Sequence, residues 1–230
     1  TGGTAESTKT VDQTKNYQKG TKNGEEVDVA AAVGVAAAQD VVSATLAGVT
    51  VDIANGITVS ATSATDIAAF GSGKSVSRTS QVGVGIGLGL GIMTGAANAS
   101  IADGSHVVHA SSIDVTATSS ENTDPAFLDK LTAEAISGAS SMDVSVAGSL
   151  AVGISIASTT ASIGDNVTVD AGGAINVATD TTSKLSAKSW ADSNSTGDVG
   201  VGASIATVYG QNTSAATIGS ADEITADSVS

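Results

Sequence analysis

Residues Val82 to Ile92 read Val-Gly-Val-Gly-Ile-Gly-Leu-Gly-Leu-Gly-Ile, with a large aliphatic side chain at every second position and glycine between. Successive side chains of a β-strand point to opposite faces, so this strict period of two predicts a strand. One face of the strand is aliphatic, and the other carries almost no side-chain volume. The aliphatic face is predicted to be the core face. The tiny face is predicted either to meet solvent or to lie closely against a second sheet.

This pattern recurs along the chain at nearly constant spacing. The first set of anchor positions is Val27, Val82, Val144 and Val199, at intervals of 55, 62 and 55 residues. A second set with the same intervals is Leu46, Ile101, Ile163 and Ile218. Self-similarity of this kind is typical of stacked repeat proteins. The sequence therefore predicts an all-β, repetitive parallel β-solenoid (β-helix) with units of about 55 residues and strands rich in small residues.

The whole chain is predicted to be a single repeat array, and the anchors divide it into successive units. Its predicted parts are residues 1–26 (the end of a preceding unit), 27–81, 82–143, 144–198 and 199–230 (a partial fourth unit), which together are expected to be a slice of a longer array. The 82–143 unit is longer than the others by seven residues, and this excess is assigned to a surface loop near 119–129. The sequence leaves open whether one unit forms one wide coil or about three coils of ~18 residues.

Asp124-Pro125 has the features of a helix start, because a capping residue precedes a proline. However, Leu131 to Ile136 aligns with Leu185 to Trp190 of the next unit, at nearly the same distance before the following valine anchor. The repeat therefore predicts a strand from Leu131 onward and confines any helical turn to the inserted loop.

Composition excludes several classes of protein. Only 2% of the residues are aromatic, so a thick globular core is not expected. The formal net charge of -14 argues against nucleic acid and anionic membranes as partners, because both attract clustered Lys and Arg. The absence of Cys excludes disulfides and thiolate metal sites. The apolar stretch from Val82 to Thr94 is too short to span a bilayer as a helix.

Candidate chemical sites have simpler structural explanations. His106 and His109 form a His-x-x-His pattern that lacks the further ligands of a metal site, and a solvated turn is favoured. The glycines from Gly83 to Gly91 lack the spacing of a phosphate loop. No catalytic residue, metal site or cofactor is predicted. Calcium is the one cofactor alternative, through the corner residues Asp103, Asp165, Asn166 and Asp170.

Two stretches resemble a known family of repeats. Residues 160–179 read Thr-Ala-Ser-Ile-Gly-Asp-Asn-Val-Thr-Val-Asp-Ala-Gly-Gly-Ala-Ile-Asn-Val-Ala-Thr, and residues 199–207 read Val-Gly-Val-Gly-Ala-Ser-Ile-Ala-Thr. They resemble the repeats of filamentous-hemagglutinin-like adhesins, particularly the leukotoxin-type filamentous adhesin repeats of very large bacterial surface proteins. The resemblance implies secretion to the cell surface by a two-partner or autotransporter route and a long β-solenoid stalk that displays adhesive parts.

The predicted function is accordingly a structural or adhesive repeat segment of a large secreted bacterial surface filament, without catalysis. Its expected partners are other copies of itself, adjoining repeats of a longer chain, or the surface of a host or neighbouring cell. An alternative makes it a self-assembling fibril or sheet subunit that docks through its small-residue face. The residues predicted for that face are Gly83, Gly85, Gly87, Gly89, Ala147, Ala151, Gly200 and Gly202. A β-helix enzyme acting on polysaccharides and an ice-binding protein are less favoured alternatives.

Overall fold

The computed structural model describes residues 5–11, 14–22, 25–77, 79–120, 131–197, 199–220 and 222–230. The described residues form strands, turns and bends, and none of them is helical. All strand pairs but one are parallel, and the pairs build three sheets. These findings confirm an all-β chain of parallel strands, and the arrangement fits a β-solenoid-like fold.

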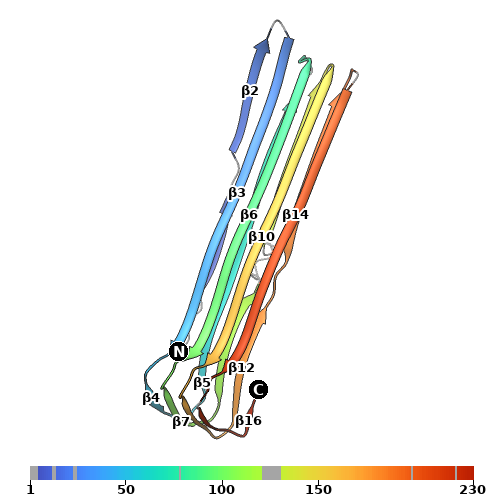
Figure 1. Ribbon diagram of the computed structural model, residues 1–230. Helices are drawn as coiled ribbons and strands as arrows, with labels where there is room; N and C mark the ends of the chain where they lie inside the picture. Colours follow the sequence, from blue (N-terminus) through green and yellow to red (C-terminus); the bar gives the residue numbers. More distant parts are fainter. Residues whose placement is uncertain are drawn as a thin grey trace.

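The first sheet, sheet B, contains the longest strands of the chain. Its parallel members are β3 (Glu25–Leu46), β6 (Val82–Ile101), β10 (Val144–Ile163) and β14 (Val199–Ile218), and β2 (Thr14–Lys22) pairs antiparallel with the outer edge of β3. The strands lie side by side in Figure 1 along almost their full length. Val82 pairs with both Val27 and Val144, and Val144 pairs with Val199. The valine anchors of the sequence therefore form one row across the sheet.

A second sheet, sheet A, carries the chain back in the opposite direction. Its members are β1 (Ala5–Val11), β5 (Ile57–Val76), β8 (Ile113–Ser120), β9 (Leu131–Ser141), β12 (Ala174–Thr181), β13 (Leu185–Ser195) and β16 (Ser228–Val229). The first part of β5 pairs with β8, and its last part pairs with β9. β8 and β9 together therefore follow the length of sheet A that β5 follows as one strand, and β12 and β13 do the same in the next unit.

The strand predicted from Leu131 onward is confirmed, because β9 begins at that residue and pairs with β13 from Leu185. The predicted loop near 119–129 is only partly covered. Ser119 and Ser120 end β8, while residues 121–130, including Asp124 and Pro125, lie outside the described residues.

The third sheet, sheet C, joins the other two at one end of the molecule, where Figure 1 shows the short strands β4 and β7. It consists of β4 (Thr50–Asp52), β7 (His106–Ala110), β11 (Thr168–Ala171) and β15 (Glu223–Thr225). Its inward side chains, such as Val107, meet Ile101 from sheet B and Ile113 from sheet A, and all three are fully buried. This closed end contains an aliphatic core.

Ile67, Met93 and Leu131 form a second core between sheets A and B, and beyond it, at the end farthest from sheet C, the two sheets lie very close together. A Cβ atom added to Gly85 would overlap the backbone carbonyl of Gly138 in β9, and one added to Gly87 would overlap that of Ile136. Stacked sheets are usually about 10 Å apart because side chains fill the gap between them. Glycine removes those side chains, so here the backbone of one sheet packs against the backbone of the other.

The packing corrects the assignment of the two faces of β6. Gly83, Gly85, Gly87 and Gly89 point inward and are buried, whereas Ile86 points outward and is 49% exposed. The prediction that the aliphatic face is the core face is therefore wrong for this part of the strand. The small-residue face is predicted either to meet solvent or to pack against a second sheet, and the structure shows the second arrangement.

Candidate interaction surface

Most of the eight residues predicted to form a docking face are buried in the structure. Gly83, Gly85, Gly87, Gly89, Ala147 and Ala151 are all buried between the two sheets. Gly200 and Gly202 in β14 are exposed, yet they point the same way, toward Ser193 and Ala191 of β13. The small-residue face is the interior contact of the two sheets, because only residues of this size allow the backbones to approach so closely.

The outward side of sheet B presents an extended apolar surface instead, which we name the aliphatic face. It consists of six successive rows across four strands. In β3 and β6 its residues are Val27, Val29, Ala31, Val33, Val35, Ala37, Val82, Val84, Ile86, Leu88, Leu90 and Ile92. In β10 and β14 they are Val144, Val146, Gly148, Leu150, Val152, Ile154, Val199, Val201, Ala203, Ile205, Thr207 and Tyr209. All of them are half-buried or exposed.

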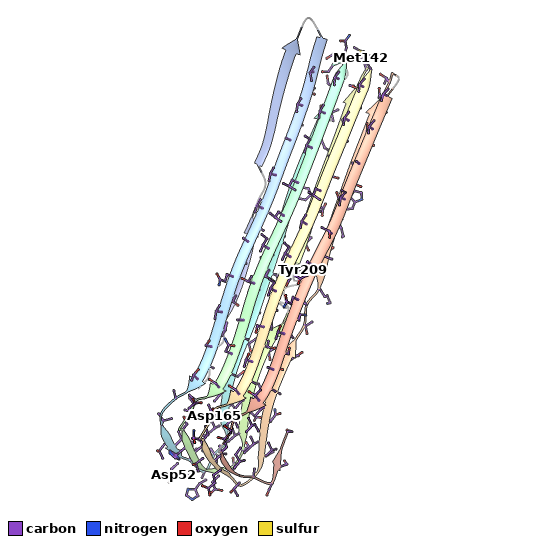
Figure 2. All side chains as sticks on the ribbon, viewed as in Figure 1. Asp52, Met142, Asp165 and Tyr209 are labelled. Carbon is purple, nitrogen blue, oxygen red and sulfur yellow. The ribbon has the colours of Figure 1, made fainter. Side chains whose placement is uncertain are left out.

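The aliphatic face carries no charge in any of its six rows, although the chain has 9 basic and 23 acidic residues. The four remaining rows of the long strands, down to the row of Leu46 and Ile101, also point only uncharged side chains outward, such as Thr94, Ser158 and Thr217. The aliphatic face thus continues into a polar, uncharged strip toward sheet C. Figure 2 shows Tyr209 on the outer edge strand and Met142 at the end of the molecule farthest from sheet C.

A shallow hollow lies within the aliphatic face, where Gly148 places no side chain among larger neighbours. Val84, Ile86, Leu88, Val146, Leu150 and Ile205 are among the residues that line it, and its volume is about 520 Å³. A Cβ atom added to Gly148 would meet no atom within 4 Å. The hollow can therefore receive an apolar side chain from outside.

The opposite side of the molecule, the outer side of sheet A, has a different character. Paired rows there place Phe70, Glu134 and Lys188 side by side. A hollow of about 560 Å³ on the same side is lined by charged and aromatic groups that include Lys74, Trp190 and Asp192. The two broad sides of the molecule therefore differ: the outer side of sheet B is aliphatic and uncharged, whereas the outer side of sheet A mixes charged groups with exposed apolar side chains such as Val76 and Trp190.

Two of the corner residues considered as calcium ligands, Asp103 and Asp165, accept hydrogen bonds from backbone N–H groups of the neighbouring corner. The backbone N–H of Asp165 donates to Oδ1 of Asp103 at 2.9 Å. Oδ1 of Asp165 in turn accepts hydrogen bonds from the backbone N–H of Ser220 at 2.7 Å and from its hydroxyl at 3.1 Å. The bond to the Ser220 N–H is the main reason that the pKa of the Asp165 carboxyl lies below its usual value. These carboxylates join successive turns of the chain at the corner marked by Asp165 in Figure 2.

His109 also has a structural partner at this end. Its Nδ1 lies 2.9 Å from Oδ1 of Asp52 in the neighbouring strand, and this hydrogen bond, together with the charge of Asp52, raises the pKa of His109. His109 has a φ of 60° and lies where β7 and β11 lose register, since Val108 and His109 oppose the single residue Asp170. The His-x-x-His pattern therefore marks a β-bulge. The described part of the chain contains no group of three or more His, Asp or Glu side chains placed to hold a metal ion.

Sequence reasoning missed the aliphatic face as a surface. The available signal was the unbroken series of glycines at alternate positions from Gly83 to Gly91, since glycine in a strand interior marks a close approach of another backbone. That signal assigns the glycine side to the interior, which leaves the aliphatic side facing outward.

Comparison with known proteins gives no relative for this chain: no protein-family model, curated protein or solved structure matches it. None of the described residues belongs to a helix long and apolar enough to cross a membrane.

Proposed function

We propose that this chain is a structural repeat segment of a large secreted bacterial surface filament or adhesin, with a mechanical role and no catalysis. The observation that carries the proposal is the register of sheet B. Each of the twenty residues of β10 pairs with its equivalent in β6 on one side and in β14 on the other. A lattice of this kind gains backbone hydrogen bonds with every added strand, so its stability grows with the number of repeats.

In this proposal one repeat unit of about 55 residues corresponds to one wide coil. Support comes from the hydrogen-bonded partners, which are separated by one unit and not by a third of a unit: Thr45 and Ser100 are 55 residues apart, and Asn176 and Asp114 are 62 apart. Neighbouring strands are about 4.8 Å apart, so the filament would lengthen by only that distance per unit. The filament axis would run across the long strands, and each coil would be much wider than it is tall.

The corner hydrogen bonds support the mechanical role. Asp103 binds the backbone of Asp165, and Asp165 binds that of Ser220, so equivalent positions are linked from one turn of the chain to the next. The links use charge-assisted hydrogen bonds, which are stronger than neutral ones. They add resistance to separation of the coils at the end that sheet C closes.

Location outside the cell is part of the proposal and rests on sequence features. These are the resemblance of residues 160–179 and 199–207 to secreted adhesin repeats and the lack of Cys. The net charge of -14 favours solubility of a protein that exposes many strands.

Immunogold electron microscopy of intact producing cells tests this role. Antibodies raised against the 230-residue chain should label filaments on the outer surface, and the gold should appear without permeabilisation. An antibody against a cytoplasmic enzyme serves as the control and should label only permeabilised cells. Label confined to permeabilised cells would overturn the proposal.

A further inference from the structure

The exposed aliphatic face is the largest feature of this molecule that its internal packing does not explain. Val35 is 43% exposed, Leu150 38% and Ile205 63%. The six rows cover eleven residues along each strand and four strands across. At about 3.3 Å per residue and about 4.8 Å per strand, the footprint is roughly 700 Å². The largest apolar patch of a typical soluble monomer is about 300–600 Å², so this surface is large enough to indicate an interface.

We infer that the aliphatic face binds the aliphatic face of a second copy of this chain, so that two sheets B pack face to face. Pairing of two such footprints buries roughly 1,400 Å² in total, which lies within the range of about 1,200–2,000 Å² for stable, specific interfaces. A second copy presents a surface of the same dimensions. This inference rests on the geometry of sheet B and is independent of the proposed role outside the cell.

Charge directs a second copy to this face and away from others. A chain with a net charge of -14 repels another copy wherever its acidic groups approach, and the aliphatic face is a broad surface whose rows contain none of them. Face-to-face pairing leaves the outer side of sheet A, with Glu134, Lys188 and Asp192, in contact with water on both sides of the dimer. The outer sides of the two sheets A, which carry the charged groups, then enclose the apolar interior, as in an ordinary layered β-protein.

The hollow at Gly148 gives the two faces shape complementarity. Two packed sheets interdigitate their side chains, and a row that lacks one side chain receives a projecting neighbour from the opposite sheet. The exposed side chains of Ile86 and Leu150 stand beside the hollow and are of the size that would fill its equivalent in the partner. In a dimer related by a two-fold axis, each copy both provides and receives such contacts.

Sedimentation velocity of the purified chain tests the inference, and Gly148→Glu is the decisive variant. Gly148 has open space around its Cβ position, so the substitution adds a charge to the face without a clash inside the fold. We expect the wild type to shift with concentration from 22.0 kDa to twice that mass, 44.0 kDa. Gly148→Glu and Ile86→Lys are expected to lose the dimer and keep the circular dichroism of the wild type. The matched control Ser140→Glu places the same charge on the outer side of sheet A and is expected to retain the dimer.

Each other outcome contradicts the inference. A wild-type chain that stays at 22.0 kDa at high concentration has no self-binding face. Association that persists in both face variants does not use the aliphatic face, because Gly148 and Ile86 lie in its interior strands β10 and β6. A monomer that floats with vesicles of neutral phosphatidylcholine, and releases them in the Gly148→Glu variant, identifies lipid as the occupant instead.

Discussion

The Oδ1 atom of Asp103 accepts a hydrogen bond of 2.9 Å from the backbone N–H of Asp165, 62 residues later in the chain. The carboxylate of Asp165 does the same for Ser220, 55 residues further on. These two carboxylates, which in the sequence suggest a cation site, thus bind one turn of the chain to the next. Both groups lie at the end of the molecule that is closed by sheet C, where the chain reverses between the two broad sheets.

Acid is expected to weaken this corner through Asp165. Because its pKa is lower in the folded chain than the ordinary value of 3.8, the carboxylate adds stability above that value and loses it as the pH falls through the folded pKa. Thermal unfolding followed by circular dichroism between pH 7 and pH 2.5 should show a smaller acid-dependent loss of Tm in Asp165→Asn than in the wild type. Asp192→Asn removes the same charge on the exposed outer side of sheet A and is the control for the loss of one carboxylate. Equal acid sensitivity of Asp165→Asn and the wild type would contradict the assignment.

The pair of His109 and Asp52 is expected to respond to pH in the opposite sense. The pKa of His109 is raised above 6.5, so the pair stabilises the folded chain below that value and loses this contribution as the pH rises through the folded pKa. Proton NMR titration should show a lower His109 pKa in Asp52→Asn. Asp170→Asn should lower it less, because Asp170 acts only through its charge and has the smaller effect. An unchanged His109 pKa in Asp52→Asn would show that the hydrogen bond is absent in solution.

Two glycines on neighbouring strands should differ strongly in their tolerance of a methyl group. Gly85→Ala places a Cβ atom against the backbone of Gly138, and overpacking of this kind costs about 1–3 kcal/mol or more. Gly148→Ala adds the same group in open space, and removal of glycine flexibility should raise stability by about 0.4–1 kcal/mol. Urea unfolding at low protein concentration measures both changes in the free energy of unfolding. Equal effects of the two substitutions would mean that the glycine side is not the interior.

Disulfide formation tests whether one repeat unit makes one coil. The hydroxyls of Thr45 and Ser100 lie 3.1 Å apart on adjacent strands, and the chain has no other Cys, so Thr45→Cys/Ser100→Cys should oxidise to an intramolecular disulfide. Thr45→Cys/Asn98→Cys is the matched control, since a shift of two residues along the strand separates the Cα atoms by roughly 8 Å, beyond the reach of a disulfide.

Mass spectrometry of tryptic peptides reports the crosslink directly. With three short coils per unit, positions 45 and 100 would be about 14 Å apart, and neither pair of cysteines would form a disulfide. Crosslinking of the control pair alone would place the strands in a shifted register.

Much of the strand framework could be predicted from the repeat. The alignment of Leu131 with Leu185 predicts a strand where the local residues after Pro125 suggest a helix, and the two positions are paired in sheet A. The bulge at His109 could not be predicted, because the spacing of the valine anchors does not reveal the one extra residue in β7. The hydrogen bond from Asp165 to Asp103 also required the structure, since spacing shows that two positions are equivalent but not which atoms meet.

The sequence by itself determined that the chain forms alternating strands with two unlike faces and that equivalent valines recur at 55 and 62 residues. A period of two distinguishes the faces but does not specify which one meets another sheet. Only the tertiary structure decided this. Gly85 and Gly87 allow sheets A and B to approach until their backbones touch, and an aliphatic side chain in that position would hold them apart. The aliphatic side of sheet B therefore points outward.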